Sequence, residues 1–447
     1  MGRPSVKRIR GSSRSLWFII LIGFLLRVIV SVFLLGDTVK PRRDYWPFGY
    51  EAGRIARSIA SGEGFANPLY DKTGPTAWMG PVFPYLLAGV FKTFGVYSKA
   101  SAVAILSVDS LFSALTCWPV YFAARRCFGP LAGFYSAWAW ALFPYAVYLS
   151  ADWVWETCLS ALLLATLFTL TLYHENFRRS SAWTGYGLLW GFAVLTNPAV
   201  LSVFLPMLGW VCYRLYRQRR NALVPAAVTV LTLLVTLTPW MARNERVFHH
   251  FVPLRDNFWL EAWVGNSGDT SHWFPESAHP STNDTELAEY NRLGEWDYMA
   301  HKRSQALAFI TSHRGAFFLT TLRRIVFTWT GYWSFDRHYL AEEPLDPPYI
   351  AFSVLVSGLM LAGLWRGFRE AREVATPYAG ILLFYPLAYY VTHANPVYRQ
   401  VIDPEIVILA MYGALSVFRK RRYSGRENLE LVGSVPGLQA KASSETK

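Results

Sequence analysis

The sequence has few charged residues for its length. They make up 16% of its 447 residues, below the roughly 25% that is typical of soluble domains. Hydrophobic residues make up 53%, and apolar runs of nearly membrane-spanning length recur along the chain. The composition therefore argues against a soluble protein and predicts an all-α integral membrane protein with many spans.

The sequence also lacks the cysteine and histidine spacings that are typical of disulfide frameworks and zinc sites. Its 4 cysteines are scattered through or beside apolar runs without CxxC spacing, which argues against a disulfide framework and a cysteine zinc site. The histidines at positions 272, 279, 301 and 313 are irregularly spaced and form no HExxH arrangement. We infer no metal site from these residues.

The net charge of +13 comes from short basic clusters that flank the apolar runs. They are the N-terminal arm (Lys7 to Arg14), Arg125-Arg126, Arg178-Arg179, Arg217 to Arg220, Arg366 to Arg372 and Arg419 to Arg422. This distribution is typical of the cytoplasmic flanks of membrane spans and not of a nucleic-acid interface. The first apolar run is long enough to span, so we expect an uncleaved first helix.

Placing every basic cluster on the cytoplasmic side predicts ten spans and two cytoplasmic termini. The spans lie near 16–36, 101–123, 131–149, 157–173, 183–196, 199–215, 222–240, 349–366, 376–392 and 402–418. Residues 182–216 would form a helix about 52 Å long, too long for one crossing, so Asn197-Pro198 is expected to divide it. We expect one transmembrane domain over 1–423 and a disordered tail over 424–447.

Two further apolar stretches, 77–95 and 317–333, are predicted to lie on the outer membrane face. Pro81 and Pro84 weaken the first as a spanning helix. Arg323-Arg324 lies in the middle of the second, where exposure to lipid would be costly. The remaining polar chemistry then falls in three outer segments, 37–100, 241–348 and 393–401.

The outer segments contain the candidate site residues. Asp44 and Glu51 follow the first span, where a carboxylate can act as a general base, bind a metal or pair with arginine. His393, Tyr398 and Arg399 lie in the third segment, and the planar guanidinium of arginine suits a phosphate group. We also expect binding contacts from Arg243, Asn266 and Glu156.

Inside the predicted bilayer, the first span contains Arg27 and the second contains Asp109. An ionisable residue at this depth is a functional candidate by default. A mutual ion pair within the bundle is an equally good explanation.

Five segments occur in an order that resembles a known group. They are "LRVIVSVFLL" with the loop "DYWPFGYEAGRIARSIASGEGF", then "GPTAWMGPVFPYLLAGVFKTFG", "WGFAVLTNPAVL", "TPWMARNERVFHHFVPL" and "HANPVYRQVIDPEIVILA". This layout, over about residues 15–420, resembles the GT-C membrane glycosyltransferases, which include protein O-mannosyltransferases and the bacterial lipid A aminoarabinose transferase. The fold that this resemblance implies is a GT-C type multi-span helical bundle with juxtamembrane helices on its outer face.

The resemblance implies transfer of a sugar from a polyprenyl-phosphate donor on the outer face, with inversion. An acidic residue of the first loop would deprotonate the acceptor, and the group's usual acidic position falls near Phe48, so Asp44 and Glu51 both remain candidates. His393 and Arg399 would hold the lipid phosphate. Asn197 stands where relatives often have arginine, so we assign it no phosphate contact. The first loop has no DxD motif, so the sequence does not support a required divalent metal; such a metal stays an open alternative, and no cofactor is assigned.

The expected partners are the lipid-linked donor, a glycan, lipid or protein acceptor, and membrane lipids, without nucleic acid. The short loops and the lack of a glycan-binding appendix favour a bacterial inner membrane protein. A lipid-linked glycan transporter or flippase, a non-catalytic scaffold of a glycan-assembly complex, and a related glycan ligase or polymerase remain alternatives. A transporter would show charged residues at mid-membrane and inverted repeats. The sequence has few such charges and no internal repeat.

Overall fold

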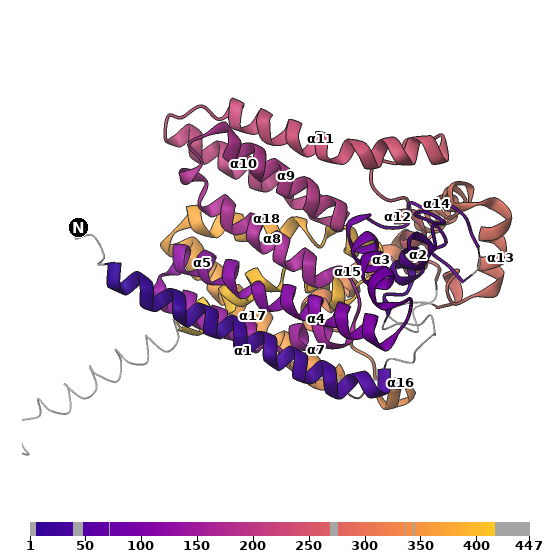
Figure 1. Ribbon diagram of the computed structural model, residues 1–447, viewed down its shortest axis with the longest axis horizontal. Coiled ribbons are helices and arrows are strands. Elements are labelled where there is room, and N and C mark those ends of the chain that lie inside the picture. The colour runs from indigo at the N-terminus through magenta and orange to yellow at the C-terminus, as the bar shows by residue number, and fades with distance from the viewer. Residues whose placement is uncertain are drawn as a thin grey trace, which may run out of the picture.

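The computed structural model describes residues 6–38, 48–70, 72–268, 276–335, 337–342, 344 and 346–415 (Figure 1). Long helices form one bundle, and shorter helices with their loops gather at one end of it, far from the N-terminus (Figure 1). Within the described ranges there is no β-strand, only an isolated bridge between Ala66 and Pro75. Asp44 and the tail over 424–447 lie outside these ranges.

Each of the ten predicted spans coincides with a helix or with two successive helices. They are α1 (Val6–Thr38), α4 (Lys99–Leu115) with α5 (Cys117–Phe128), α6 (Pro130–Ala141) with α7 (Pro144–Asp152), α8 (Thr157–Leu172), α9 (Ser180–Thr196), α10 (Leu201–Arg217), α11 (Leu223–Phe248), α17 (Asp346–Glu370), α18 (Arg372–Phe384) with α19 (Leu387–Val391), and a helix over 403–415. Six of the described helical stretches are long and apolar enough to cross a membrane by themselves.

The expected break between α9 and α10 is present. Asn197 ends α9, and its side chain accepts a hydrogen bond from the backbone N–H of Ala199 in the short 3-10 helix Pro198–Val200. A side-chain cap of this kind satisfies a backbone donor that the helix start leaves free. The two helices can therefore reverse direction within a few residues.

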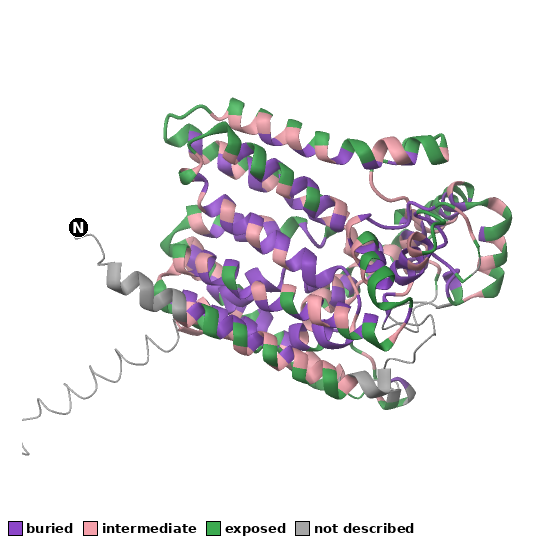
Figure 2. Ribbon diagram, viewed as in Figure 1, coloured by how far each residue is buried: buried purple, intermediate pink, exposed green. Residues whose placement is uncertain are grey.

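Large apolar side chains of the long helices, such as Phe33, Leu205 and Val235, are exposed. Figure 2 shows exposed positions along the outer helices of the bundle. In a soluble protein such a surface would mark an interaction site, whereas a lipid environment accommodates it directly. A continuous core of buried side chains, including Trp140, Leu167 and Ile406, fills the space between the spanning helices. The protein is thus an integral membrane protein.

The end of the bundle opposite the N-terminus carries an ordered cap. Its helices are α2 (Glu51–Ala60), α3 (Val82–Phe94), α12 (Phe258–Gly265), η4 (Glu276–Ala278), α13 (Asp284–Leu293), α14 (Glu295–Ser312) and α16 (Arg337–Glu342). A second core, with Phe48, Ile55, Phe83, Leu260 and Tyr290 among its members, joins residues of the first and second outer segments. The two stretches expected beside the membrane are the helices α3 and α15 (Arg314–Thr330).

Candidate active site

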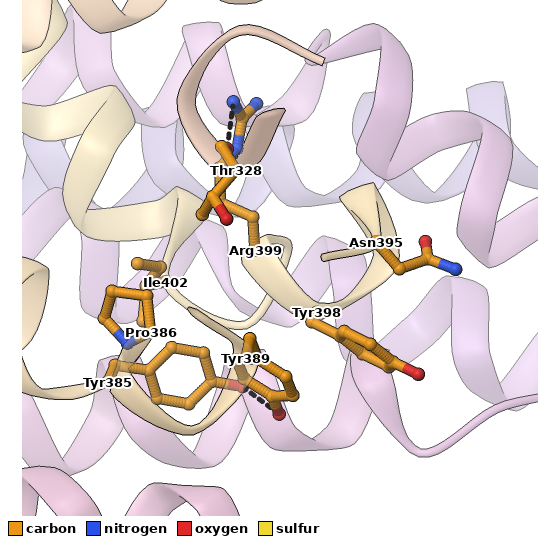
Figure 3. Close-up of a pocket in the computed structure, with 8 residues that line it drawn as sticks. All are labelled: Thr328, Tyr385, Pro386, Tyr389, Asn395, Tyr398, Arg399 and Ile402. Atoms are coloured by element: carbon orange, nitrogen blue, oxygen red, sulfur yellow. Dashed lines mark hydrogen bonds between the residues drawn. The ribbon is translucent and has the colours of Figure 1, made fainter. Parts of the chain in front are cut away.

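A small pocket lies where the third outer segment meets α15 and the end of α18 (Figure 3). Its lining residues are Thr328, Tyr385, Pro386, Tyr389, Asn395, Tyr398, Arg399 and Ile402. Two of these, Tyr398 and Arg399, belong to α20 (Pro396–Arg399) and are predicted substrate-binding residues. The structure therefore places part of the predicted third-loop cluster at a pocket.

Arg399 is almost fully buried, and two of its three guanidinium nitrogens are engaged. Nε donates to Asp403 at 3.0 Å, and Nη1 donates to the carbonyl oxygens of Thr328 and Trp329 at 3.3 and 3.4 Å. Nη2 is buried and has no hydrogen-bond partner among the described residues. A buried donor without a partner is costly, so this nitrogen is available for an anionic ligand.

Aromatic rings form the opposite side of the pocket (Figure 3). The rings of Tyr389 and Tyr398 stack with centroids 4.5 Å apart and an interplanar angle of 14°. The hydroxyl groups of Tyr385 and Tyr389 lie 3.5 Å apart.

His393 is buried behind the pocket and is held by two neighbours. Its Nε2 lies 2.8 Å from the Tyr398 hydroxyl, and its Nδ1 lies 3.4 Å from Oε2 of Glu261. Burial, together with the positive charges of Arg324 and Arg255, lowers the pKa of His393 to about 3. His393 is therefore neutral at physiological pH and brings no positive charge to a phosphate.

Arg324, which the sequence places in the middle of α15, faces protein and not lipid. It donates to the carbonyl oxygens of Gly265 and Tyr390 and to Oδ1 of Asn266. Asn266 in turn donates to the carbonyl oxygen of Val391 at 3.0 Å. These contacts connect the second outer segment to the third. Asn266 thus links the two segments beside the site. The predicted contact of Asn266 with substrate stays a prediction.

Glu156 precedes α8 at the outer end of the bundle and is buried. Burial raises its pKa to about 7, although its own backbone hydrogen bond and the charge of Arg255 oppose the shift. Oε2 has no hydrogen-bond partner within the described part of the chain. Glu156 is not among the residues that line the pocket, and its contact with substrate stays a prediction.

Glu51 is the first residue of α2 and is buried. A side chain at Gly49, just before it, would meet the carbonyl oxygen of Val154, so the start of α2 packs closely on the loop that leads to Glu156. One turn further on, the guanidinium of Arg54 lies 4.5 Å from the ring centre of Tyr50 and 3.9 Å from that of Tyr70. The other predicted base, Asp44, lies outside the described residues.

Contacts join the three outer segments in two steps. His279 of the second segment packs edge-on against Trp78 of the first, with ring centroids 5.7 Å apart. Burial is the main cause that lowers the pKa of His279 to about 3. Glu261, also of the second segment, lies 3.4 Å from His393 of the third. The second segment therefore contacts both of the others.

Arg243 holds the cap together away from the pocket. Its two terminal nitrogens donate to the carbonyl oxygens of Thr76 and Phe65 at 2.6 and 2.7 Å. Its guanidinium also lies 5.1 Å from the ring centre of Trp240. These contacts tie α11 to the first outer segment, and the expected substrate contact of Arg243 stays a prediction.

Arg255 and Glu261 lie beside His393, although neither was predicted from the sequence as a site residue. Nη2 of Arg255 lies 3.7 Å from Oε1 of Glu261, and Asn257 donates to the same carboxylate oxygen at 2.9 Å. The signal available in the sequence was the pair of charges within the aromatic run "LRDNFWLEAW". Spacing alone could not show that these charges face the third outer segment.

Together the helical bundle and the small pocket near its cap match the GT-C type fold that the sequence predicts. The predicted fold class and the resemblance to this group are confirmed. A family model described as dolichyl-phosphate-mannose-protein mannosyltransferase matches residues 75–242, from the first outer segment to α11. No curated protein matches the chain.

Two solved structures of the Archaeoglobus fulgidus oligosaccharyltransferase share the fold. The complex with zinc and sulfate has a TM-score of 0.55 and 14% identity, over 93% of this chain and 51% of that one. The enzyme AglB in complex with an inhibitory peptide and a dolichol-phosphate has a TM-score of 0.55 and 14% identity, over 93% and 52%. The chain thus spans about half the length of these relatives.

ArnT from Cupriavidus metallidurans bound to undecaprenyl phosphate is also similar, with a TM-score of 0.37 and 13% identity. The similarity covers 87% of this chain and 77% of that one. A TM-score of this size supports no comparison of individual residues.

Proposed function

We propose that this protein is a membrane glycosyltransferase that transfers a sugar, with inversion, from a polyprenyl-phosphate donor to a cell-envelope acceptor on the extracytoplasmic face. The observation that carries the proposal is Arg399, a residue that lines the pocket and whose buried Nη2 has no hydrogen-bond partner among the described residues. An anion is the ligand that satisfies such a donor. The family description and the dolichol-phosphate bound by AglB support a lipid phosphate as that anion.

The position of the pocket suits such a donor. A prenyl tail stays in the lipid, so its phosphate and sugar are reached only at the membrane boundary, where the spanning helices meet the cap. Preorganised donors such as Arg399 stabilise the charge that grows on the departing phosphate. A hydroxyl acceptor needs a base on the far side of the anomeric carbon, and Glu51 or Asp44 supplies it.

The arrangement of charges supports an extracytoplasmic cap. Arg126 and Arg214 both pair with Glu175, at 2.8 and 3.7 Å, and Arg214 also pairs with Glu373. These pairs join the basic clusters that end or begin α5, α10 and α18. Basic residues favour the cytoplasmic side, so the cap lies outside and α1 begins inside. A bacterial inner membrane is the location that we propose.

The test is transfer by the purified protein in lipid nanodiscs, with a panel of radiolabelled prenyl-phosphate sugars. Glu51→Gln and Asp44→Asn identify the base, since loss of a general base lowers the rate by about 10²–10⁴-fold. Glu63→Gln is the matched control, because Glu63 lies in the same outer segment and pairs with the exposed Lys72 at 3.0 Å. A folded wild-type protein that transfers no sugar from any donor would refute the function, whereas full activity of both base variants would refute only the base assignment.

A further inference from the structure

Three polar side chains lead from the pocket into the cap. The Tyr398 hydroxyl lies 2.8 Å from Nε2 of His393, and Nδ1 of His393 lies 3.4 Å from Oε2 of Glu261. Arg255 lies 3.7 Å from the other oxygen of Glu261. The series therefore joins α20 to α12 and ends at a part-exposed carboxyl group.

The pocket has little net positive charge that could stabilise a departing phosphate. Arg399 is paired with Asp403 at 3.0 Å, and both side chains are almost completely buried. A phosphate that departs from a sugar gains a second negative charge, which is unfavourable at a buried site. Taking up a proton as the bond breaks keeps its charge constant.

We propose that Glu261, His393 and Tyr398 form a proton relay that protonates the departing phosphate of the lipid donor. The relay rests on the proposed glycosyltransferase function. Tyr398 lines the pocket and is the catalytic residue, while His393 and Glu261 are positioning residues that act through it.

The bond between the anomeric carbon and the phosphate oxygen breaks, and its electron pair stays on the phosphate, which takes the proton of the Tyr398 hydroxyl. The Tyr398 oxygen takes a proton from Nε2 of His393, and Nδ1 of His393 takes one from the carboxyl group of Glu261. The lipid phosphate leaves as a monoanion, and the negative charge that it would have carried resides on Glu261.

The surroundings suit both ends of this transfer. Burial raises the pKa of Glu261, which favours the protonated starting form, and Arg255 stabilises the carboxylate that forms. The Glu261 side chain is 19% exposed, so water can return its proton. Burial lowers the pKa of His393 to about 3, so the ring passes a proton on and does not keep it. The charged and titratable groups that face the relay from other elements are Arg255, Arg324, His279, Glu156 and Tyr389.

Steady-state kinetics over a pH series test the relay. Tyr398→Phe is expected to lower kcat about 100-fold, because it removes a general acid, while KM for the lipid donor changes less than about threefold. In the wild type, kcat should fall at high pH as Glu261 loses its proton. In Glu261→Gln the rate should be low, and this decline should be absent. Wild-type kcat in both variants, or an unchanged decline in Glu261→Gln, would overturn the relay.

Tyr390→Phe is the matched control, since its hydroxyl contacts Trp329 at 2.9 Å and not His393, and its pH profile should equal that of the wild type. A second measurement needs no turnover. In ¹⁵N-histidine NMR, with His393→Gln to assign the signal, the His393 tautomer should change between about pH 5 and pH 9 in the wild type but not in Glu261→Gln. An unchanged wild-type tautomer would refute the proton path even if the protein transferred no sugar.

Discussion

At the residue scale, two buried arginines differ in what their guanidinium groups contact. Arg27 donates to Ser113 and to the carbonyl oxygens of Gly23, Ala141 and Trp140, at 2.8–3.2 Å. Ala141 and Trp140 lie at the end of α6, and the residue that would donate to the Trp140 carbonyl in a longer helix is Pro144, which has no N–H. Arg27 thus satisfies a helix end inside the membrane.

The alternative of an Arg27–Asp109 pair is wrong. Both carboxyl oxygens of Asp109 are buried and have no hydrogen-bond partner among the residues that the structure describes. Arg27, whose guanidinium nitrogens all donate hydrogen bonds, has a structural role. Arg399 differs because its Nη2 has no hydrogen-bond partner among the described residues.

We expect Arg399→Lys to lower kcat/KM for the lipid donor at least about tenfold, because the charge remains but one charge-assisted hydrogen bond of about 1.5–3 kcal/mol is lost. The measurement is transfer kinetics with varied donor concentration. Arg369→Lys is the control, since its guanidinium stacks on Trp365 at 3.8 Å, near the end of α17. Equal donor kinetics in wild type and Arg399→Lys would remove the phosphate role.

At the element scale, the helix that follows Arg399 packs closely on α17. A Cβ atom at Gly363 would overlap the carbonyl oxygen of Leu409, and one at Gly413 would overlap that of Leu359. Membrane helices associate through such small residues because there is no hydrophobic gain between helices in lipid. This contact fixes the direction in which residues 403–415 leave the site.

Gly363→Ala should destabilise the protein by about 1–3 kcal/mol, because an added methyl group forces these two backbones apart. The midpoint of thermal unfolding in detergent measures the effect. Gly358→Ala in the same helix is the control, since a Cβ there meets nothing within 4 Å and should change stability by no more than about 1 kcal/mol. Equal unfolding midpoints for the two variants would contradict the close packing.

At the scale of the whole molecule, the cap depends on neutral histidines. His279 has an ordinary pKa of 6.5 and a folded pKa of about 3. Below about pH 6.5 the unfolded chain takes up a proton that the folded protein does not, so this contribution to stability is complete above that pH and is lost as the pH falls toward 3.

His279→Asn removes this titration. The unfolding midpoint of the wild type relative to His279→Asn should therefore fall as the pH decreases from about 6.5 to 4, because protonation favours the unfolded state only when the histidine is present. Burial raises the pKa of Glu156, Glu261 and Glu295, whose protonation acts in the opposite direction in both proteins, so only the difference between the proteins is diagnostic. A difference that does not change with pH would argue against a buried, neutral His279.

The sequence by itself determined where the long apolar helices of the bundle lie, because hydropathy and the distribution of arginine depend on the lipid environment of each segment. It also predicted α3 and α15 beside the membrane, the break at Asn197 and the residues Tyr398 and Arg399 at the pocket. Only the tertiary structure decided which charges meet. Arg255, Glu261 and His279 lie more than a hundred residues from His393, and Arg324 and Arg243 are occupied by backbone carbonyls. Such contacts depend on how separate loops pack on one another, and no local pattern of residues records that packing.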